Sequence, residues 1–403
     1  MSDTTPRPGL RAMPFGEFIV MLALLFATVA FSIDAMLPLL AQMGAELRPA
    51  SPADAQMVIT VFVLGFGLGT FVAGPLSDRF GRKPLIMAGI ALYMAAAVLA
   101  AVSDSLEMLL LARLLQGLGA AGPRVASQAL VRDLYAGRHM ARVMSFVMTI
   151  FVLVPAVAPL VGAQIGGMFG WRAIFWSFLF FGVISGTWLA MRQPETLPPD
   201  RRRPLHPADL WAALREVLGN ARVRLFLLAL SLCFAPMFAW LASVALIFDE
   251  TFGRGPEFPY WFALVAVMSA PASLINAQLV VRLGMQRLIS VALGVQIATA
   301  LIFLVLTMAG VVVFPVFVVF MWLQFFSIGL IFGNLNALAL EPLGHVAGMA
   351  TSVMGGVSTM AAALIATPIA RAFDGTAGPL AAGALVCAAL ALLCVRLAAR
   401  RSI

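Results

Sequence analysis

The sequence has little charge, little cysteine and little histidine. Only 11% of the 403 residues are charged, whereas a soluble domain carries about a quarter. Hydrophobic residues make up 62%, and the mean hydropathy is +1.00. The three cysteines lie in apolar segments without metal-ligand spacing, which predicts ordinary packing and no metal site. The three histidines are scattered, which argues against an enzyme or a cofactor site. The chain is therefore expected to lie in a lipid bilayer.

Long apolar runs recur along the whole chain, separated by short polar breaks. About 20 apolar residues span a bilayer as a helix. The runs predict an all-α integral membrane protein with twelve transmembrane helices in two six-helix halves. The predicted spans are 15–38, 55–75, 84–102, 107–128, 141–165, 173–191, 224–248, 259–281, 287–308, 312–338, 346–370 and 378–397.

The one long polar connection divides the chain near its middle. We expect a cytoplasmic N-terminus at 1–14, a first bundle at 15–191, a linker at 192–222 and a second bundle at 223–403. The linker is rich in proline at first and then shows helical spacing of apolar residues from Pro207 to Gly219. This pattern predicts an amphipathic helix on the inner membrane surface.

The positive charges predict the orientation. Of the 26 Lys and Arg residues, Arg48, Arg172, Arg254 and Arg371 fall in one alternate set of connections, and Arg113 falls within a span. All the others fall in the opposite set of connections, in the span ends that border those connections, or in the termini. Cytoplasmic loops carry the excess of Lys and Arg, so both termini are expected in the cytoplasm and the chain in the cell inner membrane. No soluble basic domain suggests a nucleic-acid partner.

A weak internal repeat supports duplication. A shift of 203 residues aligns Ala277–Gly284 with Gly74–Gly81, matching leucine, arginine and glycine at equal positions. Both segments follow the second predicted span of their half, as expected for parallel repeats.

The first repeat contains a charged run, GPLSDRFGRKP, between two apolar helices. A phosphate-binding loop would need Ser or Thr after the lysine and a preceding strand, and both are missing. The residues instead predict a tight hairpin, in which Gly74–Pro75 ends or bends the helix and Gly81 allows the reversal. Asp78 is an acid among positive charges and is expected to pair with an arginine or a helix N-terminus. A purely topological loop is the alternative.

Arg113 and Asp34 are the charged residues within predicted spans that are candidates for a function. Arg113 is expected to face a cavity or a partner, because a charge at membrane depth is costly, and Gln116 lies one turn further on the same face. Asp34 stands near the outer end of the first span. If it faces the central cavity, desolvation disfavours its charged form and suits it to carry a proton. If it lies beyond the lipid boundary, it is a solvated helix-end residue.

The fifth span contains helix-bending and small residues. Pro155 and Pro159 are one turn apart, and Gly162 and Gly166 follow. Proline removes a backbone hydrogen bond, and glycine opens a groove for a neighbouring helix. A kink that serves packing alone is the alternative.

The charged hairpin resembles the signature loop of the major facilitator superfamily, G-x-L-a-D-r-x-G-r-k. This resemblance implies two pseudo-symmetric halves and alternating access. It also implies a conformational latch formed by Asp78 and Arg82 with Arg132 or Asp133. The run RLLQGLGAA, which begins at Arg113, resembles the superfamily motif implicated in proton coupling. The helix-5 run resembles the antiporter motif, with alanine in place of two of its glycines.

Further motifs resemble the bicyclomycin/chloramphenicol-resistance subgroup of drug:proton antiporters. They are D-x-x-L-P from Asp34, A-P-L-V-G in the fifth span, GWRAIFW (170–176) and GNLNALA (333–339). Ile33, Met36 and Gly333 depart from the residues that are usual there.

The resemblance implies export of drug-like small molecules in exchange for protons, without a cofactor, by a monomer. The residues expected to contact substrate are Gln116, Phe234, Met237, Phe238, Trp240, Gln324, Asn334 and Asn336. Aromatic and methionine side chains suit apolar molecules of varied shape. A proton-coupled carrier of a sugar or an amino-acid derivative is the alternative, although such a carrier usually has more polar groups in its cavity. A membrane-embedded enzyme or a sensor fits the sequence less well.

Overall fold

The computed structural model describes residues 13–47, 52–135, 137–202 and 207–400, and these are almost entirely helical, with no β-strand among them. Ten helical segments of this described chain are long and apolar enough to span a membrane, and α5 and α6 complete the twelve. Helices suit a bilayer because they satisfy their backbone hydrogen bonds internally. The predicted fold class is confirmed.

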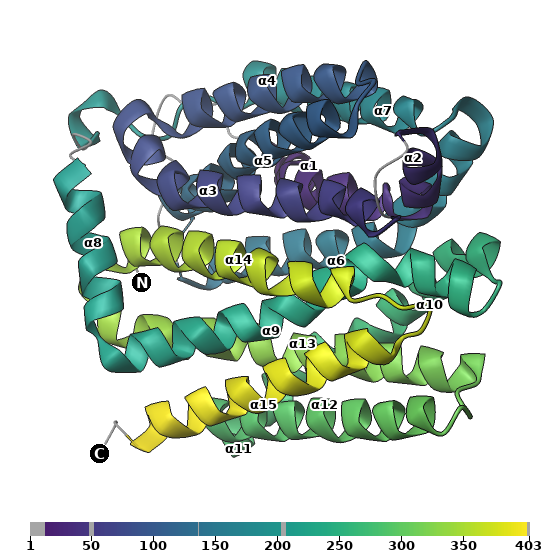
Figure 1. The fold of residues 1–403 in the computed structure, drawn as a ribbon. Coiled ribbons are helices and arrows are strands. Elements are labelled where there is room, and N and C mark those ends of the chain that lie inside the picture. The colour runs from purple at the N-terminus through teal and green to yellow at the C-terminus, as the bar shows by residue number, and fades with distance from the viewer. Residues whose placement is uncertain (1–12, 48–51, 136, 203–206, 401–403) are drawn as a thin grey trace.

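The first set of spans runs from α1 to α7 and forms the upper layer in Figure 1. A short turn and the small helices η1 and α2 extend α1 at one end of the bundle, and η2 leads into α3. The bounds are α1 Phe15–Asp34, η1 Leu37–Leu39, α2 Leu40–Leu47, η2 Pro52–Gln56, α3 Met57–Phe80, α4 Arg82–Ala101, α5 Leu106–Leu134, α6 Gly137–Phe169 and α7 Arg172–Arg192.

The second set forms the lower layer, and α8 runs along one side of the molecule between the two layers (Figure 1). The bounds are η3 Pro199–Arg201, α8 Pro207–Gly219, α9 Ala221–Leu246, η4 Ile247–Thr251, η5 Gly255–Glu257, α10 Phe258–Ser269, α11 Pro271–Leu283, α12 Met285–Met308, α13 Phe314–Leu340, η6 Glu341–Val346, α14 Ala347–Arg371 and α15 Gly378–Arg400. The end of the bundle that carries α8 is called the α8 end below, and the opposite end is called the α2 end.

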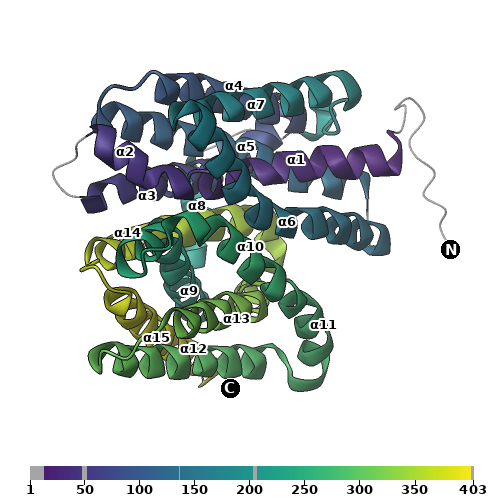
Figure 2. The same ribbon diagram turned by 90° about the vertical axis from the view of Figure 1, so that its right-hand side faces the viewer.

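One predicted span is interrupted. The segment 259–281 forms two helices, α10 and α11, which meet at Ala270, and Figure 2 shows them as separate helices at one side of the second set. Pro271 causes the break, because it has no N–H to donate and its ring crowds the preceding turn. The Trp322 indole N–H donates to the Met268 carbonyl oxygen, 3.2 Å away, beside the break.

The connection after α3 and the connection after α11 have similar backbone geometry. Gly81 (φ 106°, ψ 163°) and Gly284 (φ 77°, ψ 154°) both stand at positive φ between two helices. They are the aligned glycines of the predicted duplication, and only glycine adopts such a backbone without strain. Gly74–Pro75 does not end α3, because the helix continues through Pro75 to Phe80.

The two sets pack against each other mainly through α3 and α14, which lie side by side in both views (Figures 1 and 2). Small residues permit this approach. A Cβ atom at Gly74 would overlap the Ser352 hydroxyl oxygen, and one at Gly356 would lie 2.8 Å from the backbone of Phe71. At the α2 end, α6 also packs against α10, and η1 against α9.

Candidate functional site

Arg113 is fully buried within the first set of helices. The apolar surroundings are compatible with its charge because its guanidinium donates to three oxygen atoms. These are the Ser32 carbonyl oxygen at 3.0 Å, the Val58 carbonyl oxygen at 3.2 Å and Gln116 Oε1 at 2.5 Å. The guanidinium also lies 4.2 Å from the centre of the Phe62 ring. The arginine therefore joins α1, α3 and α5.

Tyr93 on α4 belongs to the same buried network. Its hydroxyl group lies 2.5 Å from the Ser32 hydroxyl group, and both residues are buried. Sequence reasoning missed Ser32 and Tyr93. A possible signal was that Tyr93 is one of only three tyrosines in the chain and lies within an apolar span.

Asp34 is the last residue of α1, two residues beyond the carbonyl group that Arg113 contacts. Only 4% of its surface is exposed, so this structure places it as a buried residue rather than as a solvated helix end. Within the described residues, its carboxyl group forms no ion pair and accepts no hydrogen bond. Its role in proton coupling stays a prediction.

The helix-5 motif lies against the end of α1. A Cβ atom at Gly162 would overlap the Ala35 carbonyl oxygen, and one at Gly166 would overlap the side chain of Leu39. The two prolines of the motif, Pro155 and Pro159, both lie inside α6. Because glycine has no side chain, Gly162 and Gly166 let α6 approach the turn that directly follows Asp34.

Arg82 lies between two carboxylates at the α8 end. Its guanidinium donates to Asp78 at 2.5 Å and to Asp133 at 2.9 Å, and it also contacts the Ser77 hydroxyl group at 3.0 Å. These contacts join the ends of α3, α4 and α5, so three of the four predicted latch residues lie together. Arg132 is exposed and forms no ion pair with Asp78 within the described chain. The latch itself stays a prediction.

Glu195 is a further member of this cluster, which sequence reasoning missed. Its two carboxylate oxygens accept from the backbone N–H groups of Arg82 and Lys83, each at 3.0 Å. These are the first two N–H groups of α4, which have no partner within the helix, and a negative charge is favourable there. Oε1 also accepts from the backbone N–H groups of Thr196 and Leu197, each at 2.8 Å. Glu195 lies 113 positions after Arg82 in the sequence, so no local pattern indicated the contact.

The predicted substrate residues do not form one group. Phe234 and Phe238 on α9 are half-buried and stacked with ring centres 6.0 Å apart, and Phe332 on α13 lies 3.9 Å from Phe234. Met237 lies on the same helix and is also half-buried. Trp240, in contrast, is buried among phenylalanines of α13.

The polar residues of α13 are distributed over its length. Gln324 is buried and donates to the Thr299 hydroxyl group at 3.1 Å and to the Gln296 carbonyl oxygen at 3.3 Å. Asn334 donates to Asn276 Oδ1 on α11 at 2.6 Å, and Asn336 is exposed. Gln324 thus contacts α12, whereas Asn334 contacts the second part of the interrupted span.

The fold and its motifs identify the family. The sequence profile of the Major Facilitator Superfamily matches residues 20–367. The chain belongs to this superfamily. A D-xylose-proton symporter of known structure covers 93% of this chain and 97% of its own, with a TM-score of 0.72 and 14% identity, which shows the shared fold. The predicted superfamily is therefore confirmed.

The relatives of this superfamily member include drug-resistance proteins. It is 28% identical to a bicyclomycin resistance protein homolog of Haemophilus influenzae over 374 residues, covering 90% of this chain and 91% of the relative. It is 26% identical to multidrug resistance protein D of Escherichia coli over 361 residues, covering 87% and 88%. These similarities agree with the subgroup that the sequence motifs resemble. The chain is thus a multi-pass membrane protein of a transporter family.

Proposed function

We propose that this superfamily member exports drug-like amphiphilic molecules from the cytoplasm in exchange for protons. The observation that carries the proposal is its similarity, over nearly the whole chain, to proteins named for bicyclomycin and multidrug resistance. These relatives favour drug export over the transport of a sugar or an amino-acid derivative. The excess of Lys and Arg at the α8 end supports placing that end, with both termini, at the cytoplasmic face of the inner membrane.

Asp34 is the proposed proton carrier. It is an acid buried at the end of α1 without an ion-pair partner in the described chain, and α6 approaches the next residue closely. Arg113 contacts the carbonyl group two residues before it, so a shift of this turn when the proton binds or leaves would reach α5 directly. Arg113 is a positioning residue in this proposal.

The contacts of Arg82 with Asp78 and Asp133 supply the proposed latch. They join α3 to α5 at the α8 end, beside the close contact of α3 with α14. Rocking of one half against the other changes the position of α14 relative to this cluster. Because each half of one chain supplies six spans, we propose that the monomer is the working unit.

The available energy is sufficient for such exchange. One proton that moves inward through 100 mV supplies about 2.3 kcal/mol. This corresponds to a gradient of roughly fiftyfold for one molecule exported per proton.

The proposal can be tested in a host that lacks its own efflux pumps. Expression of the chain should raise the tolerated concentrations of chloramphenicol and ethidium, and a protonophore should remove this protection. Everted vesicles should accumulate ethidium only while a proton gradient is maintained. Accumulation that survives the protonophore, or equal sensitivity with and without the chain at matched expression, would contradict the proposal.

A further inference from the structure

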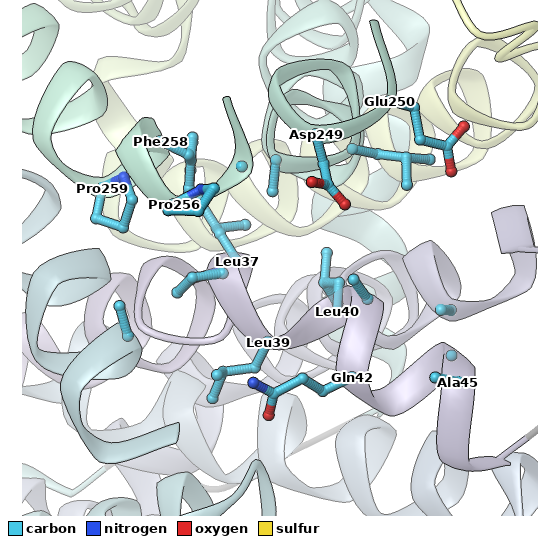
Figure 3. Close-up of a pocket in the computed structure, with 18 of the residues that line it drawn as sticks. Leu37, Leu39, Leu40, Gln42, Ala45, Asp249, Glu250, Pro256, Phe258 and Pro259 are labelled. Atoms are coloured by element: carbon cyan, nitrogen blue, oxygen red, sulfur yellow. The ribbon is translucent and has the colours of Figure 1, made fainter. Parts of the chain in front are cut away.

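A pocket of about 570 Å³ lies between the two halves at the α2 end. One wall comes from η1, α2, η2 and α6 of the first half, and the other comes from α9, η4, η5 and α10 of the second. Figure 3 shows Leu37 and Leu40 of the first half across from Asp249 and Phe258 of the second. The volume is that of a site for a drug-sized molecule, and the walls are mainly apolar.

Among the described residues, the wall of the pocket contains two carboxylates and no basic side chain. Asp249 and Glu250 lie in η4, directly after α9, and both are exposed. Figure 3 shows the Asp249 carboxylate directed toward the residues of η1 and α2, with Glu250 at the edge of the pocket. Neither side chain forms an ion pair or accepts a hydrogen bond from another residue in the described part of the chain.

The described arginines at this end pair with other acids. Arg172 contacts Glu46, Arg254 contacts Glu257 at 3.2 Å, and Arg371 contacts Asp54 at 3.0 Å. None of these three arginines forms an ion pair with Asp249 or Glu250. The two carboxylates therefore give the pocket and its edge a negative potential.

A buried amide in the same wall also has unused hydrogen-bonding capacity. Gln56 of η2 is only 3% exposed, and neither its amide nitrogen nor its amide oxygen has a hydrogen-bond partner among the residues that the structure describes. An unsatisfied buried amide is costly, and its presence in the wall of a pocket indicates a place where a ligand or water supplies the partner.

We propose that this pocket binds lipophilic organic cations, with Asp249 and Glu250 selecting for positive charge and the apolar walls holding the organic groups. This proposal rests on the proposed export function. In that function, the pocket is the site that a cation occupies before it leaves the protein at the α2 end. Its walls belong to both halves, so movement of one half against the other changes its shape. This site is separate from Asp34, which does not line it.

The test is binding of tetraphenylphosphonium to the purified full chain, measured by titration calorimetry. The double variant D249N/E250Q should bind this cation about tenfold more weakly, because it removes two favourable charge–charge interactions with the ligand. Binding of chloramphenicol, which is neutral, should be unchanged. The matched control is E107Q, which removes an acid from the first turn of α5 outside the pocket and should leave both affinities unchanged.

Further measurements keep the test decisive. The single variants D249N and E250Q should each show part of the loss if the double variant fails to fold. High salt should weaken binding to the wild-type chain more than to the double variant. Tetraphenylphosphonium affinity of the double variant within twofold of wild type would overturn the proposal, as would loss of binding in D34N alone, which would place the cation elsewhere.

The outcomes separate this pocket from the proposed function. If the wild-type chain binds the cation through Asp249 and Glu250 but vesicles move no solute, export is wrong and the pocket stands. If vesicles export and D249N/E250Q is unchanged in binding, the pocket alone is wrong.

Discussion

Arg113 donates a hydrogen bond of 3.0 Å to the main-chain carbonyl oxygen of Ser32. This contact joins a fully buried cation of α5 to the last turn of α1, two residues before Asp34. A movement of that turn must therefore either move Arg113 or break its hydrogen bond.

Replacement of Arg113 should destabilise the protein. R113A removes three hydrogen bonds from a buried charged donor, each worth about 1.5–3 kcal/mol. R113K keeps the charge but lacks the planar fork, so its effect should be intermediate. The apparent melting temperature in detergent measures this, with R224A at an exposed arginine of α9 as the control. A melting temperature of R113A equal to that of wild type would contradict the contact network.

Asp34 should be needed for coupling and not for folding. D34N has nearly the same shape and removes a buried acid that has no partner in the described chain. We expect unchanged or raised thermal stability, because an unpaired charge is costly to bury. Proton-dependent accumulation of ethidium in everted vesicles should be lost at equal protein amount. Coupling that persists in D34N would remove Asp34 from the mechanism.

The sequence predicted the spans and the polar clusters because these depend on local patterns. Apolar runs of about 20 residues indicate helices, and a charge in such a run indicates a buried network, as found for Arg113. The aligned glycines of the repeat, Gly81 and Gly284, could likewise be read from the sequence, and both have positive φ.

Other partners in these clusters could not be predicted from local patterns. Tyr93 and Glu195 reach their contacts from helices or loops far away in sequence, so only the packing of the helices brings them together. The amide of Gln324 donates to Thr299 of α12. This contact was not predicted, because the helical period alone does not say which face of a helix meets which neighbouring helix. The break at Ala270 was missed because the apolar run continues through Pro271, so hydropathy alone indicates a single uninterrupted span.

Glu195 should stabilise the start of α4. E195A removes an acceptor for the first two N–H groups of that helix and should cost about 1–2 kcal/mol, the typical value for a lost helix cap. E195Q keeps one acceptor oxygen and should lose less. Thermal unfolding in detergent provides the measurement, and D200N, at an exposed acid of the same connection, is the matched control. Equal stability of E195A and D200N would show that the cap is unimportant.

Gly356 should be required for the contact between α3 and α14. In G356A the new methyl group would lie 2.8 Å from the backbone of Phe71, which cannot move away as a side chain can. The neighbouring variant G355A serves as the control. Its new methyl group would lie 3.3 Å from a methyl carbon of the Thr70 side chain, which is a longer contact and involves no backbone atom. Ethidium export by G356A should fall severalfold, since overpacking costs about 1–3 kcal/mol in the state that holds this contact. Equal export by both variants would show that this contact does not belong to the transport cycle.

The exchange of drug for protons is tested most directly by running it in reverse. Purified protein in sealed proteoliposomes, with no imposed pH difference, is given a steep gradient of ethidium, and the internal pH is followed with a trapped dye. Proton movement opposite to the ethidium flux, lost in D34N and absent from empty liposomes, is the predicted result. Ethidium flux without any proton movement, or proton movement in the same direction as ethidium, would contradict proton-coupled export.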